Sequence, residues 1–533
     1  MLNKKPALFL VFLLIFSLLL TGCSFGDKTT DTSEKMVRAA WPHITPEYFD
    51  FVNSDQTGTY YVYGLIGDPL IRYDDNVMQF VPAIASDWTV EENNTVFTFE
   101  IRDDVYFHNG NRLTVEDVEF TFEKHLDPEN PSGSAERLML IEGAQEKMMG
   151  ETDKVFGIEV IDDNKIQFTL TGPRADFLGI MAMSVHSILD KDELLERGGA
   201  IVATSDEPFT GVTGPFKICS HGSVTPEEKE EKERLFFEFI KNENYFDNKA
   251  NIDRLIVEDF PGREVVVNKF LDGYYDIVLL ADNIPDLEQY ATPMSLGAVN
   301  ILKFNVQKEL WQDENIRKAF RYAINEDSLV EITNNKKQKG LLPNILPGVE
   351  PIEEDVYDLE LAKEYLEEAG YPKGEGLPVI KLIYLGGNPL QLKQLELVEN
   401  QLNDLGIEIN VVQLAGLDEL KERLPNADII KLGVGANYYD AMSLLDYTLL
   451  KNAPHNYFGM EHDKIERLIQ ASREETNQYT RFAIHNEINQ IVHDEALIIP
   501  VDNMIVYLFE SDRLKSVRHD YLGDINYENI DIR

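Results

Sequence analysis

Hydrophobic and polar positions recur along this chain with two different periods. Between residues 86 and 107 the period is two. Phe97, Phe99 and Ile101 lie on one side of the expected strand, and the residues between them are polar. Residues 158–170 repeat this pattern around a polar turn, which predicts a β-hairpin.

Other segments have the helical period. A helix is expected from Thr114, which can form a capping box with Asp117 three residues on. In a second helix, at about 313–324, apolar residues recur at i, i+3, i+4, i+7 and i+8. Asp358 can cap a third helix, which ends at Gly370.

The rest of the second half alternates between helix and strand. This alternation favours α/β lobes over an all-α or all-β body. The expected elements are a helix at 392–405, strands at 407–414 and 428–434, helices at 463–473 and 478–493, and a strand at 497–509.

The N-terminal pattern is of another kind. Lys4 and Lys5 precede an apolar run from Ala7 to Leu20, which is too short to span a bilayer. This is the layout of a secretory signal. The tetrad Leu20-Thr21-Gly22-Cys23 resembles a bacterial lipoprotein box, in which the Cys is lipidated and becomes the new N-terminus.

We therefore expect residues 1–22 to be a lipoprotein signal peptide, Cys23 to be the lipid attachment site and residues 23–35 to be a flexible tether. An ordinary signal peptide with a chance Cys, or an uncleaved anchor, are the alternatives. Lipidation of Cys23 would leave Cys219 as a lone thiol, without an internal disulfide.

The charge limits the partners. The formal net charge is −45, from 49 basic and 94 acidic residues, and the signal peptide removes only Lys4 and Lys5. Such a surface argues against nucleic acid and against an electrostatic hold on anionic lipid. It permits attraction of cationic solutes, although a soluble acidic surface explains it equally simply. We expect contact with the membrane through the lipid anchor only.

No catalytic motif is present. The sequence contains no nucleophile elbow, phosphate-binding glycine loop, HExxH or paired CxxC, and its ten histidines are scattered. Two converging carboxylates could still make a hydrolase, but nothing singles out such a pair. We expect a protein that is not an enzyme and needs no cofactor.

Several blocks occur in an order that resembles one family. They are DPLIRY at 68–73, VPAIA at 81–85 followed by Trp88, the segment 97–122, and GVTGPFK at 211–217. With similar blocks further on, the resemblance covers 37–533. By these motifs the chain resembles the extracytoplasmic solute-binding proteins of family 5, the oligopeptide and dipeptide receptors of ABC importers.

The resemblance implies a two-lobed α/β periplasmic-binding-protein fold of type II with the extra subdomain of the peptide-binding cluster. Lobe I would comprise residues 36–300, including the extra subdomain at about 66–172. Lobe II would comprise 301–500, and residues 501–533 would return to lobe I.

The implied function is that of a lipid-anchored receptor on the extracytoplasmic face of the bacterial cell membrane. It would capture oligopeptides between hinged lobes and deliver them, as a monomer, to an ABC permease and ATPase. Alternatives are a sugar, an amino-acid derivative or a metal complex as the solute, a secreted hydrolase, and a peptide sensor that transports nothing.

The resemblance also suggests ligand-binding residues. In lobe II these are Gly433, Val434, Gly435, Ala436, Asn437, Tyr438 and Asp440; in lobe I they are Gln56, Thr57 and Gly58. The family pattern has an Asp, which holds the peptide ammonium, where this chain has Asn437. Asp440 could supply that charge instead, or it could cap the following helix, and Asn437 could cap a turn.

Overall fold

The computed structural model describes residues 34–41, 57–91, 93–198, 208–224, 234–260, 262–281, 283–352, 357–386, 388–515, 517–520 and 522–533. For residues 57–61, 223–224 and 234 it describes the backbone alone. Cys23 and Gln56 lie outside the described residues.

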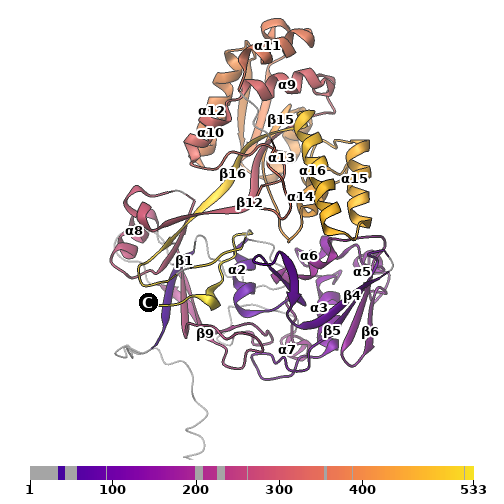
Figure 1. The fold of residues 1–533 in the computed structure, drawn as a ribbon, viewed down its shortest axis with the longest axis vertical. Coiled ribbons are helices and arrows are strands. Elements are labelled where there is room, and N and C mark those ends of the chain that lie inside the picture. The colour runs from indigo at the N-terminus through magenta and orange to yellow at the C-terminus, as the bar shows by residue number, and fades with distance from the viewer. Residues whose placement is uncertain are drawn as a thin grey trace, which may run out of the picture.

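In this part of the chain ten strands form one sheet that runs through the whole molecule (Figure 1). In order across the sheet they are β14 (Ile409–Leu414), β13 (Ile380–Leu385), β15 (Ile429–Gly435), β12 (Ala291–Phe304), β16 (Ile498–Glu510), β11 (Ile277–Leu280), β1 (Met36–Trp41), β10 (Arg254–Asp259), β9 (Arg234–Lys241) and β8 (Phe216–Val224). Strands β13 to β15 are parallel to one another, as are β10, β1 and β11, while β12 and β16 are antiparallel to their neighbours.

The sheet divides into two halves, which we call lobe I (β1 and β8–β11 with their helices) and lobe II (β13–β15 with theirs). Strands β12 and β16 are paired with each other and pass from one half to the other (Figure 1). Their register shifts between Ser295 and Val299 and again between Asn300 and Ile301, and Gly297 has a φ of +60°. A bulge bends a strand locally, so these shifts bend the two strands that connect the lobes.

Helices cover both faces of the lobe II half. Alternate residues of β12 enter opposite cores, with Ile301 against α14–α16 and Leu302 against α9, α11 and α12. The helices are α9 (Glu314–Ala323), α10 (Glu326–Thr333), α11 (Leu359–Glu368), α12 (Pro389–Asn403), α13 (Leu417–Arg423), α14 (Met442–Leu449), α15 (Asp463–Glu474) and α16 (Gln478–Asp494).

Lobe I contains two small sheets besides its half of the large one. One is the hairpin β2 (Ile71–Asp74) and β3 (Gln79–Pro82); the other has the order β4 (Ala85–Glu91), β5 (Val96–Ile101), β7 (Lys165–Thr169), β6 (Ile158–Asp162). Its helices are α2 (Thr57–Ile66), α3 (Val115–His125), α4 (Ala135–Leu138), α5 (Ala144–Met148), α6 (Phe177–Met181), α7 (Lys191–Glu196) and α8 (Arg263–Leu271).

Short 3₁₀ turns connect several of these elements. They are η2 (Ser184–His186), η3 (Pro285–Tyr290), η4 (Glu309–Gln312), η5 (Pro372–Gly374), η6 (Leu424–Asn426) and η7 (Tyr527–Asn529). None of the helices in the described residues has the length and apolarity needed to cross a membrane.

The local predictions agree well with these elements. Phe97, Phe99 and Ile101 are buried along β5, and Thr114 forms the expected capping box with Asp117 at the start of α3. Cys219, in β8, is disulfide-bonded in this unlipidated chain, whereas lipidation of Cys23 would leave it as the expected lone thiol.

Candidate functional site

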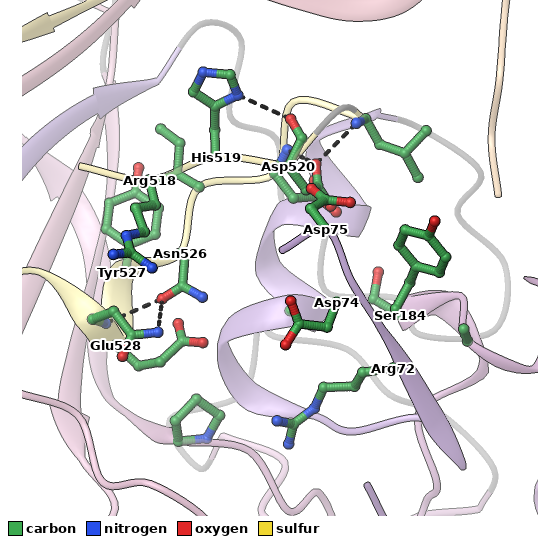
Figure 2. A pocket seen from close by; sticks show the side chains of 18 of the residues that line it. Arg72, Asp74, Asp75, Ser184, Arg518, His519, Asp520, Asn526, Tyr527 and Glu528 are labelled. Atoms are coloured by element: carbon green, nitrogen blue, oxygen red, sulfur yellow. Dashed lines mark hydrogen bonds between the residues drawn. The ribbon is translucent and has the colours of Figure 1, made fainter. Parts of the chain in front are cut away.

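A cavity of about 730 Å³ lies against lobe I, with side chains of lobe II closing one wall. Many of its lining residues come from three parts of the chain: the hairpin β2–β3, the segment around Ser184, and the C-terminal arm, by which we mean residues 517–520 and 522–533. From lobe II come Asn437 and Tyr439. Figure 2 shows Arg72 and Asp74 on one side and Tyr527 and Glu528 of the C-terminal arm on the other.

A buried polar cluster fixes the lobe I wall. Arg72 Nη2 donates to Asp68 Oδ1 at 2.6 Å, and its Nη1 donates to Asp247 Oδ2 at 3.1 Å. Asp68 also accepts from the hydroxyl groups of Tyr245 and Thr213, both at 2.8 Å. Burial opposes the charge of Arg72, but Asp68, Tyr245 and Glu528 together outweigh this effect, so the pKa of Arg72 is raised. The charges of this cluster are therefore largely paired within the protein.

The C-terminal arm contributes further carboxyl groups to the cavity, among them those of Asp520 and Asp524. Trp41 Nε1 donates to the hydroxyl group of Tyr527 at 2.6 Å, which fastens the arm to β1. Asp520 Oδ2 accepts from the Tyr439 hydroxyl group at 2.5 Å, and its Oδ1 accepts from the backbone N–H of Asp524 at 2.8 Å. No described residue donates a hydrogen bond to the carboxyl group of Asp524.

The pKa values of three carboxyl groups in the C-terminal arm are raised. Burial raises the pKa of Asp520. Burial and the neighbouring charge of Asp520 raise the pKa of Asp524 well above its usual value, and burial raises that of Glu528. A cation in the cavity would favour their ionised forms.

The segment predicted to bind the ligand follows β15 and is only partly at this cavity. Of the residues 433–438 and Asp440, only Asn437 lines it. Asn437 Oδ1 is buried and has no hydrogen-bond partner among the described residues. An amide oxygen in this position can accept a hydrogen bond from a ligand. The interpretation of Asn437 as a turn cap therefore has no support from this oxygen.

The strand β15 itself keeps a partly open edge. It pairs with β12 from Ile429 to Gly435, but with β13 only from Ile429 to Lys431. Residues 432–435, which include three of the predicted binding residues, thus have a single strand neighbour among the described strands. Gly433 is exposed, whereas Val434 is buried.

Asp440 is used inside the protein. Its Oδ2 forms an ion pair with Arg481 at 2.7 Å, and its Oδ1 accepts from the backbone N–H of Met442 at 2.9 Å, at the start of α14. Asp440 thus contacts the first turn of α14, although the N-cap position itself is Ala441, and the charge of Asp440 is already balanced. In lobe I, Thr57 and Gly58 begin α2, whose first residues are described as backbone only.

Tyr438 does not line the cavity but lies in a direct contact between the lobes. Its hydroxyl group donates to Asp176 Oδ2 at 2.8 Å, and both residues are almost fully buried. Arg174 holds Asp176 in two hydrogen bonds and reaches Asp446 of lobe II at 3.0 Å. Arg473 pairs with the same Asp446 at 2.9 Å.

Charges in this contact balance one another. Burial opposes ionisation of Asp176, but Arg174, Arg481 and the Tyr438 hydroxyl group together outweigh burial and hold the pKa of Asp176 below its usual value. Burial raises the pKa of Asp446 in spite of its two arginine partners. The contact lies beside α6 and α14, where Figure 1 shows the lobes meeting.

The sequence indicated Tyr439 as a wall residue of the site, but it indicated neither the C-terminal arm nor the pairing of Tyr439 with Tyr73. The rings of this pair are stacked, with centroids 5.0 Å apart and an interplanar angle of 13°. Asp520 and Asp524 lie in a short polar turn that gives no signal of its own in a chain with 94 acidic residues.

Sequence comparison identifies relatives along most of the chain. A sequence model of the middle region of the bacterial extracellular solute-binding proteins, family 5, matches residues 79–456. The dipeptide-binding protein of Escherichia coli (strain K12) is 24% identical over 492 aligned residues, covering 87% of this chain and 88% of that protein. The oligopeptide-binding protein OppA of Bacillus subtilis (strain 168) is 24% identical, with 99% of each chain covered. Heme-binding protein A of Haemophilus influenzae is also 24% identical, covering 84% of this chain and 83% of that protein.

Solved structures show the same fold. A periplasmic murein tripeptide-binding protein in its unliganded open form superposes with a TM-score of 0.77 at 17% identity, covering 94% of this chain and 98% of that one. HbpA2 of Haemophilus parasuis gives a TM-score of 0.77 at 19% identity, covering 93% and 100%. The predicted two-lobed type II fold is confirmed.

Proposed function

Because this chain belongs to the bacterial extracellular solute-binding proteins, family 5, we propose that it is a lipid-anchored receptor that captures oligopeptides for an ABC importer. The peptide is held between the hinged lobes, passed to the permease unaltered, and replaced by the next. Homologous binding proteins for dipeptides and oligopeptides support a peptide as the solute.

The cavity at the lobe boundary is the observation that carries this proposal. Its 730 Å³ lie within the range of small-molecule sites, about 300–1,000 Å³. Its walls come from both lobes, so a bound ligand stabilises the closed arrangement by contacting both at once. Asn437 offers an acceptor for a peptide ammonium, and the open edge of residues 432–435 offers backbone groups for an extended peptide.

We assign the ligand contacts accordingly. Asn437 is the acceptor in the cavity, and the backbone of Gly433 to Ala436, which precedes Asn437 in the chain and does not itself line the cavity, is the strand edge to which the rest of the peptide adds. Thr57, Gly58 and Gln56 remain predictions for the facing lobe. Asp440 is a less suitable partner for the peptide because Arg481 already neutralises it.

Mass spectrometry of material that co-purifies with the full-length protein tests this function. We expect peptides that bind again, with micromolar or tighter affinity in calorimetry, and that are recovered uncleaved. Recovery of heme, a metal complex or a sugar in place of peptide would change the identity of the solute but would leave the proposed receptor function intact. Recovery of cleaved peptides would overturn the proposal that the protein is a receptor.

The lipid anchor is a separate part of the proposal. It rests on the signal layout and on Cys23, which lies outside the described residues. The chain contains two cysteines, so a disulfide of Cys219 within one molecule and lipidation of Cys23 exclude each other. Intact-mass analysis of the membrane fraction should show a chain that begins at Cys23 and carries a diacylglycerol group.

A further inference from the structure

A second cavity, of about 520 Å³, lies between the small sheet of lobe I and the helices of lobe II. Its lobe I wall comes from β3, β4 and α6, and its lobe II wall from the start of α14 and from α16. Figure 1 places α14–α16 directly above α6 and β4. This cavity therefore exists only where the two lobes face each other.

Tyr73 and Tyr439 are the two residues that line both this cavity and the first. They form the stacked pair described above, with one ring from each lobe. Tyr439 is held by its hydrogen bond to Asp520, and Tyr73 meets the ring of Phe80 edge-on at 5.3 Å. The two cavities are thus neighbours that share a wall of two aromatic rings.

The second cavity is lined by large aromatic and apolar side chains from both lobes. They are Phe80, Trp88, Val90, Phe97, Leu178 and Phe482. Aromatic rings pack on one another with a preference of about 0.5–1.5 kcal/mol beyond the area that they bury. A ligand group that fills this space favourably is therefore an aromatic ring.

Two nearly fully buried polar side chains of the lobe II wall keep unused atoms. Arg481 is 7% exposed; its Nε donates to Ser472 O and its Nη1 pairs with Asp440, but its Nη2 has no partner among the described residues. His485 is 2% exposed; its Nε2 bonds to the hydroxyl group of Ser472 at 2.7 Å, but its Nδ1 has no partner there.

These two side chains differ in what they can bind. Burial lowers the pKa of His485 to about 4, so the ring is neutral at pH 7 and its free nitrogen can accept a hydrogen bond. Arg481 can only donate. A phenolic hydroxyl group is both donor and acceptor, and so it matches both needs where a phenyl ring matches neither.

We propose that this second cavity is a side-chain subsite that takes one aromatic residue of the peptide, tyrosine best, while the peptide backbone occupies the first cavity. Because the stacked rings of Tyr73 and Tyr439 separate the two cavities, that side chain would pass beside this pair. The inference rests on the proposed peptide-binding function and adds the side chain that the receptor selects.

The test is calorimetric titration of the full-length protein with tri-alanine and with the three tripeptides that carry one tyrosine. We expect tyrosine at one position to tighten binding at least tenfold over tri-alanine, and phenylalanine there to give a smaller gain. Val90→Trp places a bulky ring at the rim of the second cavity, where Val90 is 39% exposed. This variant should lose the tyrosine gain and bind tri-alanine within twofold of wild type.

The matched control is Val77→Trp. Val77 is 53% exposed in the β2–β3 turn and lines neither cavity, so this variant should keep the tyrosine gain. Gln478→Trp, on the exposed start of α16, fills the same cavity from lobe II and replaces Val90→Trp if that variant does not fold.

Three outcomes decide the proposal. A wild-type protein that binds tri-alanine and all tyrosine peptides equally overturns the subsite, as does a tyrosine gain that survives in the folded filling variant. A wild-type protein that binds none of these peptides overturns the peptide-binding function, and the subsite with it.

Discussion

Replacing Tyr438 by Phe should weaken ligand binding although Tyr438 does not line the ligand cavity. The hydroxyl group of Tyr438 in lobe II donates to Asp176 in lobe I at 2.8 Å, and the residues are 2% and 1% exposed. Tyr438→Phe removes this bond and keeps the ring. Asp176 retains its two hydrogen bonds from Arg174, so the variant leaves no buried charge without a partner.

The size of the effect follows from the kind of bond lost. A hydrogen bond to a charged group contributes about 1.5–3 kcal/mol. This bond spans the lobes, so its loss disfavours the closed state relative to an open one. Since about 1.4 kcal/mol corresponds to a tenfold change in Kd, ligand affinity should fall by up to about ten- to hundredfold, and by less the more the ligand-free wild-type protein is already closed.

Calorimetry with a peptide ligand, combined with small-angle scattering without ligand, measures both consequences. We expect a weaker Kd and a larger radius of gyration for the ligand-free variant. Tyr479→Phe is the control, because Tyr479 is 80% exposed on α16. A Kd within twofold of wild type together with an unchanged scattering curve would show that the Tyr438–Asp176 contact does not contribute to closure.

Three further predictions concern the ligand site and the anchor. Asn437→Asp should tighten binding of peptides with a free amine, measured by calorimetry against their N-acetylated forms; equal affinities for both forms in both proteins would remove Asn437 from the amine site. Affinity for a free-amine peptide should rise with pH above the ordinary titration range of Asp, because the raised pKa values of Asp520 and Asp524 mean that binding a cation must displace protons. In the denatured, unreduced protein from membranes, thiol titration should find one free thiol, from Cys219, if Cys23 is lipidated; finding none would favour the disulfide.

Local structure was predictable where neighbouring residues determine it. The capping box of Thr114 and Asp117 and the N-cap of Asp358 depend on residues three or fewer positions away, and both are present. The helix expected at about 313–324 is α9, with Asp313 as its cap. Period and capping act within a few residues, so a single sequence contains the information that they need.

The site was less predictable because it is assembled from distant parts of the chain. Asp440 had two open interpretations, and Arg481, far along the chain on α16, balances its charge. The contact of Tyr439 with Asp520, and that of Tyr438 with Asp176, join residues whose sequence neighbourhoods give no sign of each other. Only the packing of the lobes brings them together.

Charge is balanced differently in the two regions where lobe II faces lobe I. In the buried contact, Asp176 and Asp446 each have arginine partners from the protein. In the first cavity, no arginine among the described residues pairs with Asp520 or Asp524. Burial raises the pKa of both carboxyl groups, and the charge of Asp520 raises that of Asp524 further.

The lobes can therefore meet without a ligand, while the cavity keeps a deficit of positive charge that a ligand can supply. A peptide ammonium would favour the ionised carboxyl groups and release protons on binding. The affinity of a free-amine peptide should then rise with pH while that of its N-acetylated form stays level. Parallel pH profiles for the two forms would show that these carboxyl groups do not interact with the amine.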